Sequence, residues 1–133
     1  MSELHLGGCH CGSLRYQFSA PLHDIAHCHC SVCRRSSGGT LITWLTVPLE
    51  SFVWTCGEPA QYQSSASCTR YFCPTCGAQL ALFTRLSPHS LDVTVATLDQ
   101  PERAHPDRHI WVRSRLPWLH LDPQLPEEDE ERL

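Results

Sequence analysis

Three cysteines in one short loop are the residues of this chain best placed to do chemistry. Cys28, Cys30 and Cys33 lie in the stretch C-H-C-S-V-C. Thiolates this close together suit a single zinc ion, and they supply three ligands where zinc usually takes four. A metal held by three protein ligands keeps one position for another molecule. The spacing therefore predicts a catalytic zinc site formed by these three residues.

The charge of such a site indicates what would fill the fourth position. Three thiolates around Zn²⁺ leave a net charge of about −1 and weaken the pull of the metal on bound water. The site is better suited to a thiol, which the metal holds as a nucleophilic thiolate. We therefore expect a small-molecule thiol such as glutathione as the partner. The expected reaction forms or breaks a carbon–sulfur bond with an aldehyde.

Charged and titratable residues flank the three cysteines. Arg34 and Arg35 follow the third cysteine directly. An arginine fork pairs well with a carboxylate, so we assign substrate binding to Arg34 and expect Arg35 to face solvent. His27 and His29 flank the first two cysteines, where they could donate hydrogen bonds or carry protons. One of them could also be the fourth ligand, although a position outside the ligand set is the expectation for both.

Four more cysteines form two pairs that are distant in sequence. Cys9 and Cys11 make a C-x-C pair, while Cys73 and Cys76 lie in C-P-T-C-G. Together they offer four thiolates, enough for a closed structural zinc site, and Gly77 allows the tight turn of a zinc knuckle. A redox C-x-x-C usually opens a helix in a βαβ unit, whereas this motif lies between expected strands. We therefore predict two zinc ions, one structural and one catalytic.

The number and setting of the cysteines favour metal over disulfides. There are nine, an odd number, and residues 1–8 contain no apolar run typical of a secretory signal. No stretch approaches the ~20 apolar residues of a membrane span. We therefore expect a cytoplasmic protein with no membrane partner. Cys56 and Cys68 are expected to be small buried residues, although either could close the three-cysteine site.

Net charge excludes some functions. The chain carries −4 overall, but residues 127–133 alone hold five acids and one arginine, so the remainder is neutral. A neutral body lacks the basic field of a nucleic-acid-binding protein. All ten basic residues are arginine, and the absence of lysine excludes Schiff-base chemistry on a lysine.

The hydrophobic pattern predicts a small all-β domain of antiparallel strands tied together by metal. Residues 52–55 and 60–64 flank a turn signal and are expected to form a hairpin. Residues 31–37 form the one expected helical turn. We expect a single zinc-binding β domain over residues 1–121 and an acidic, disordered tail over 122–133. The remaining expected strands cover residues 12–19, 40–47, 67–72, 77–83 and 91–97.

Taken together, four segments resemble the glutathione-dependent formaldehyde-activating enzyme family, which includes centromere protein V. The resemblance implies a zinc-knuckle antiparallel β fold similar to the zinc-binding chaperones of Rab GTPases. It also implies two zinc sites on the two cysteine groups above. The named reaction of the family condenses glutathione with formaldehyde to S-hydroxymethylglutathione. The matching segments are G-G-C-H-C-G-S-L-R-Y (7–16), H-C-H-C-S-V-C-R-R-S-S-G (27–38), F-C-P-T-C-G (72–77) and R-H-I-W-V-R-S-R-L-P-W-L (108–119).

A second function stays open at this point. The chain could be a non-catalytic zinc-binding module that binds a protein partner. That alternative requires both zinc sites to be closed by protein ligands alone. The sequence does not determine the oligomeric state.

Overall fold

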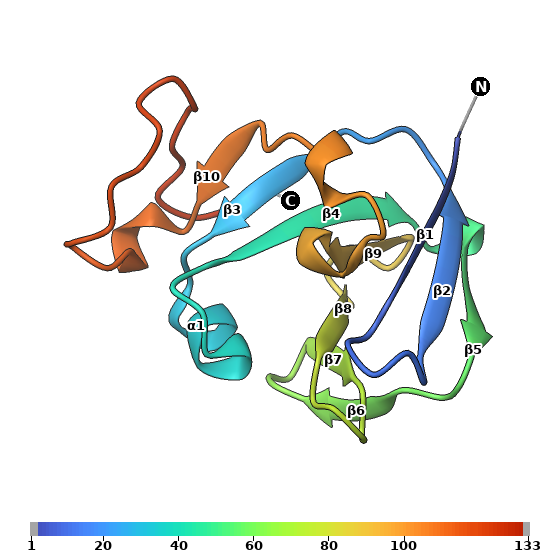
Figure 1. Cartoon of the computed structure of the whole chain (residues 1–133). Helices are drawn as coiled ribbons and strands as arrows, with labels where there is room; N and C mark the ends of the chain where they lie inside the picture. Colours follow the sequence, from blue (N-terminus) through green and yellow to red (C-terminus); the bar gives the residue numbers. More distant parts are fainter. Residues whose placement is uncertain (1–2, 132–133) are drawn as a thin grey trace.

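The computed structural model describes residues 3–131 and confirms the predicted all-β fold. Ten strands and one short α-helix follow one another along this part of the chain, with 3₁₀ turns between them (Figure 1). None of the helices described there is long and apolar enough to cross a membrane. The elements are β1 (Leu4–Gly8), β2 (Arg15–Ser19), β3 (Ile25–Cys28), α1 (Ser31–Ser37), β4 (Ile42–Pro48), β5 (Phe52–Cys56), β6 (Ala60–Gln63), β7 (Cys68–Phe72), β8 (Gln79–Thr84), β9 (Ser90–Thr94) and β10 (Arg108–Ile110).

The strands form two sheets. The smaller has the order β1-β2-β5, and the larger has the order β10-β3-β4-β9-β8-β7-β6. Every pairing is antiparallel except that of β10, which runs parallel to β3 at the edge of the larger sheet. In Figure 1 the smaller sheet lies on the right, and α1 lies below β3 and β4 on the left.

The predicted hairpin of residues 52–55 and 60–64 is wrong. Both segments are strands, but β5 pairs with β2 in the smaller sheet and β6 pairs with β7 in the larger one. The turn at Gly57 carries the chain from one sheet to the other. Gly57 has φ +77°, and a Cβ there would lie 2.2 Å from the carbonyl oxygen of Ser13. The turn signal was therefore real, but it marks a crossing between sheets.

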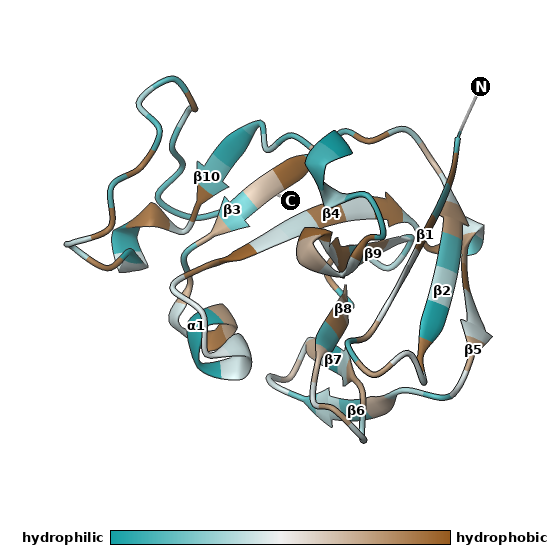
Figure 2. Ribbon diagram, viewed as in Figure 1, coloured by the Kyte–Doolittle hydropathy of each residue, from teal (hydrophilic) through white to brown (hydrophobic). Residues whose placement is uncertain are grey.

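Aromatic packing holds the smaller sheet against the larger one. Tyr16 and Phe18 on β2 are fully buried, and the ring of Phe52 on β5 stacks on Tyr16 at 5.2 Å. Trp54 meets the Tyr16 ring edge-on at 6.1 Å. These rings join the aliphatic residues of β4, β8 and β9 in one core. Figure 2 shows hydrophobic stretches on β4 and β8, whereas the edge strand β10 is largely hydrophilic.

One face of the larger sheet carries a row of side chains beside the three-cysteine segment. In β7, β8, β9 and β4, Arg70 is paired with Leu82, Leu82 with Asp92, and Asp92 with Thr46. Residues directly opposite one another in antiparallel strands point to the same face of a sheet. This row of side chains therefore lies on one face, and the three-cysteine segment lies against it.

The acidic C-terminal segment, expected to be a disordered tail, lies against β10 in the structure. The His109 N–H donates to the Pro126 carbonyl oxygen and the Glu128 N–H to the His109 carbonyl oxygen, both at 2.9 Å. Arg108 Nε lies 3.3 Å from a Glu128 carboxylate oxygen. β10 is an edge strand with free backbone groups, and the segment satisfies them while its acids pair with arginine. This observation concerns residues 122–131, because residues 132–133 lie outside the described part of the chain.

Candidate metal centres

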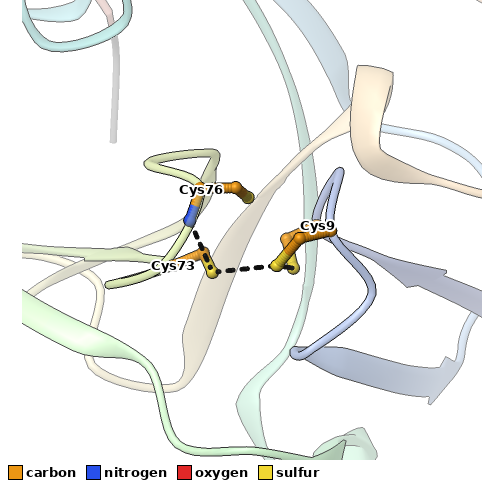
Figure 3. Close-up of side chains that lie close together, drawn as sticks. Cys9, Cys73 and Cys76 are labelled. Carbon is orange, nitrogen blue, oxygen red and sulfur yellow. Dashed lines mark hydrogen bonds between the residues drawn. The ribbon is translucent and has the colours of Figure 1, made fainter.

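Two distant turns bring together the four cysteines of the expected structural site. Cys9 and Cys11 come from the turn after β1, and Cys73 and Cys76 from the turn between β7 and β8. Their Sγ atoms all lie within 4.8 Å of one another. Cys9 Sγ is 3.6 Å from Cys11 Sγ, which is 3.7 Å from Cys73 Sγ. Figure 3 shows Cys9, Cys73 and Cys76 pointing toward one another from the two turns.

The surroundings of these sulfurs suit thiolates. Backbone N–H groups donate to sulfur, from Leu14 to Cys9 at 3.3 Å and from Cys76 to Cys73 at 3.3 Å. Hydrogen bonds from Ser13, and then from the backbone of Cys76, lower the pKa of the Cys73 thiol to about 5. The turn itself depends on Gly77, whose φ is +81°.

The four-sulfur geometry fits zinc. Zinc–sulfur bonds of ~2.3 Å in a tetrahedron place the sulfurs about 3.8 Å apart. The sulfur–sulfur distances given above, 3.6 Å and 3.7 Å, are close to this value. All four sulfurs come from two turns of this chain, so a zinc ion held there would have a full set of four protein ligands.

The three remaining predicted ligands form a second group. Cys28 ends β3, Cys30 caps the N-terminus of α1, and Cys33 lies in its first turn. The three Sγ atoms lie within 4.8 Å of one another, and those of Cys28 and Cys33 are 3.5 Å apart. The Cys33 N–H donates to Cys30 Sγ at 3.2 Å. The short helix therefore begins where it can turn two sulfurs toward the third.

The thiols of this second group differ in pKa. Hydrogen bonds with Cys28 and Cys33 lower the pKa of the Cys30 thiol to about 3. Hydrogen bonds with Cys30 and Cys33, together with burial, raise the pKa of Cys28. A bound metal ion favours the thiolate form of closely spaced thiols and releases their protons. The three sulfur donors and their spacing therefore fit zinc as well.

The three-cysteine group opens on a cavity of about 600 Å³. The cavity lies between α1 with the C-terminal segment on one side and the face of the larger sheet on the other. Its walls are apolar at Trp44, Leu82 and Trp111 and charged at Arg70 and Asp92. Burial raises the pKa of the Asp92 carboxyl to about 6.

Candidates for a fourth protein ligand lie outside the group. Among the described residues, only the three cysteines place ligand atoms within reach of one another here. Cys68 lines the same cavity but is not a member of the group. Cys56 is exposed and Cys68 half-buried, so the expectation that both are buried is wrong. His27 Nδ1 lies 2.7 Å from Thr43 Oγ1, while the fully buried His29 is hydrogen-bonded through Nε2 to a third histidine, His109, at 3.0 Å.

The arginines are arranged differently from the expectation. Arg34 does not line the cavity; its Nη2 donates to the carbonyl oxygen of Ser114 at 3.3 Å, and Ser114 is on the cavity wall. Two other arginines, Arg70 and Arg108, do line the cavity, and Arg70 is the one in contact with Cys33, although it was not among the expected site residues. The available signal was a charged residue at an inward position of β7, flanked by Thr69 and Tyr71.

Comparison with known proteins identifies the family of the chain. The model of the glutathione-dependent formaldehyde-activating enzyme family matches residues 4–114, which include all seven clustered cysteines. The chain belongs to this family. Its matched region runs from β1 through β10, so both cysteine groups lie within the family domain.

Two relatives extend the comparison. A Halomonas elongata protein named "Putative glutathione-dependent formaldehyde-activating enzyme" is 25% identical over 125 residues, which cover 87% of this chain and 80% of the relative. A crystal structure of a Rhodobacter sphaeroides protein superposes with a TM-score of 0.63 at 24% identity. The match covers 92% of this chain and 98% of that one. The second similarity supports the fold.

Proposed function

We propose that the protein is a zinc-dependent enzyme that joins a thiol, such as glutathione, to an aldehyde, or separates them. The observation that carries the proposal is the three-cysteine group with its open cavity. Three protein sulfurs in reach of one metal ion, next to about 600 Å³ of space, leave room for a further ligand. Membership of the family supports the choice of glutathione and formaldehyde as first substrates to test.

The residues of the chain would act in the following way. Cys28, Cys30 and Cys33 hold the zinc, which when bound supplies a positive centre that lowers the pKa of an incoming thiol. The sulfur adds to the aldehyde carbon, so one C–S bond forms and the C=O π bond opens. The carbonyl oxygen then takes up the proton that the thiol released, and no oxidant or reductant is needed.

The cavity walls would orient the two reactants. Trp44, Leu82 and Trp111 exclude water from the region beside the cysteines. We propose that Arg34 receives a carboxylate of the thiol at the edge of the cavity, next to Ser114. The four-cysteine group at the turn between β7 and β8 would hold a second zinc with a purely structural role.

Turnover of glutathione with formaldehyde tests the proposal. NMR exchange spectroscopy would follow the rate of interconversion between formaldehyde and S-hydroxymethylglutathione with the zinc-loaded protein. Wild type is expected to accelerate the exchange, and Cys30→Ser to abolish the acceleration together with one equivalent of zinc. Cys56→Ser is the matched control, because Cys56 is exposed and lies outside both groups. Full acceleration by Cys30→Ser would overturn the mechanism.

A further inference from the structure

Arg70 is a buried cation without a carboxylate partner. The side chain lies on β7 and is only 4% exposed. Its Nε donates to Ser64 Oγ at 3.1 Å, and its Nη2 donates to Cys33 Sγ at 3.6 Å. Its Nη1 is buried and has no acceptor within residues 3–131. No acidic side chain in the same range lies within ion-pair distance of this guanidinium.

The acid in the same row across the sheet does not neutralise Arg70. Asp92 lies two strands away, separated from Arg70 by Leu82 in the row across the sheet. An Asp92 carboxylate oxygen accepts instead from Thr46 Oγ1 at 2.6 Å. A buried charge is costly unless an opposite charge compensates it. Among residues 3–131, the only group in contact with Arg70 that could carry a compensating negative charge is the cysteine cluster, reached through Cys33.

We propose that Arg70 is the counter-cation of the three-cysteine centre and selects an anionic ligand for its fourth position. The proposal rests on the proposed function, because it assumes that a guest ligand binds there. Three thiolates and Zn²⁺ carry about −1, and a guest thiolate would bring the centre to about −2. The guanidinium reduces that charge by one. Without Arg70, a second uncompensated negative charge would be buried beside the cavity.

A counter-cation and a residue that only supports the local structure predict different effects on guest binding. Loss of Arg70 should weaken the binding of a guest that arrives as an anion and leave a neutral guest almost unaffected. A general disturbance of the site would weaken both guests alike. The sign of the effect follows from Coulomb's law at the short distance between the guanidinium and the sulfurs.

The test measures guest affinity on the cobalt-loaded protein. Cobalt(II) replaces zinc and gives sulfur-to-metal absorption bands that report a fourth sulfur ligand. The guests are 2-mercaptoethanol, which binds as a thiolate, and imidazole, which binds as a neutral ligand. Arg70→Gln is expected to weaken 2-mercaptoethanol about tenfold or more, equivalent to roughly 1.4 kcal/mol, and imidazole by no more than about twofold. Arg103→Gln, at an exposed ion pair with Glu3, should change neither.

A second variant keeps the proposal testable if Arg70→Gln fails to fold. Arg70→Lys retains the charge and is expected to keep thiol affinity within about threefold of wild type. Loss of thiol affinity as large as in Arg70→Gln, or an equal loss for imidazole, would overturn the role of Arg70 as counter-cation. Unchanged thiol affinity in Arg70→Gln would do the same. If wild type shows no spectral change with any thiol, the proposed function falls as well.

Discussion

Cys11 Sγ lies 3.7 Å from Cys73 Sγ, although 62 positions separate the two residues in the chain. Cys11 belongs to the turn that joins the first two strands of the smaller sheet, and Cys73 to the turn between β7 and β8 of the larger sheet. A zinc ion between them would therefore tie the two sheets together. Since a small core gains much of its net stability from such a staple, metal at this centre should dominate the stability of the fold.

We predict that Cys73→Ser lowers the free energy of unfolding by about 3 kcal/mol or more and removes one equivalent of zinc. Cys73 is fully buried in the four-sulfur group, so the variant loses a ligand that no neighbour replaces. Urea unfolding and metal analysis provide the measurements. The control Cys56→Ser should stay within ~0.5 kcal/mol of wild type. Equal stability of the two variants would show that this centre does not hold the fold together.

The backbone of the knuckle gives a second prediction. Gly77 has φ +81°, a conformation that costs an L-residue about 1–2 kcal/mol. Apart from Gly77 and its two chain neighbours, no described residue has an atom within 4 Å of a Cβ placed there, so this penalty is free of steric clash. Gly77→Ala should lower stability by that amount, and Gly77→Asn by less, because asparagine tolerates the left-handed region. Thermal unfolding of the two variants would show which of them is more stable. A Gly77→Asn variant less stable than Gly77→Ala would contradict this prediction.

The C-terminal segment should contribute to stability. Deletion of residues 126–133 removes the acceptor for the His109 N–H and the donor to the His109 carbonyl oxygen. It also removes the Glu128 partner of Arg108. We expect urea unfolding to give the shortened protein a free energy of unfolding about 2 kcal/mol lower than that of wild type. A deletion without effect would mean that the segment does not bind β10 in solution.

Asp92 gives a prediction for pH. Burial raises the pKa of its carboxyl from the ordinary 3.8 to about 6, so the folded protein binds this proton more tightly than the unfolded chain does. Ionisation of Asp92 therefore costs stability, and the cost grows as pH rises from about 4 to about 6. Asp92→Asn keeps an oxygen for Thr46 and should gain up to about 3 kcal/mol at pH 7.5.

The pH dependence of that gain separates it from other causes. The advantage of Asp92→Asn over wild type should shrink as pH falls from 6 toward 4, measured by urea unfolding of the zinc-loaded proteins. Asp99 is the control, because the hydrogen bond from Arg15 lowers its pKa. Asp99→Asn should therefore bring no gain at pH 7.5. A gain for Asp92→Asn that is independent of pH would rule out the buried charge as its source.

Local patterns predicted much of this fold, and long-range pairing accounts for what they missed. Alternating residues in β2 and the apolar run in β4 indicated strands because side chains on these strands face a core. The segment after β5 was misassigned because a turn signal reports only that the chain turns. Whether Gly57 closes a hairpin or a crossing between sheets depends on Ser13 and its neighbours, which are distant in sequence.

In the candidate site, too, local motifs predicted some features and long-range packing determines the others. Cysteine spacing indicated which sulfurs would group, because ligands of one metal ion tend to come from short motifs. The contact of Arg70 with Cys33 depends on the packing of β7 against α1, and no motif encodes it. The contacts of the acidic tail were not predictable for a related reason. Its charge predicted solvation, but Arg108 and the open edge of β10 hold it in place.

Zinc X-ray absorption with and without glutathione tests the central claim most directly. Four sulfurs at one centre and three at the other predict an average of about 3.5 sulfur ligands per zinc in the protein alone. Addition of glutathione should raise the average to about 4, with replacement of a light-atom ligand. An average of about 4 before any thiol is added, unchanged by glutathione, would contradict the account and favour a non-catalytic zinc module.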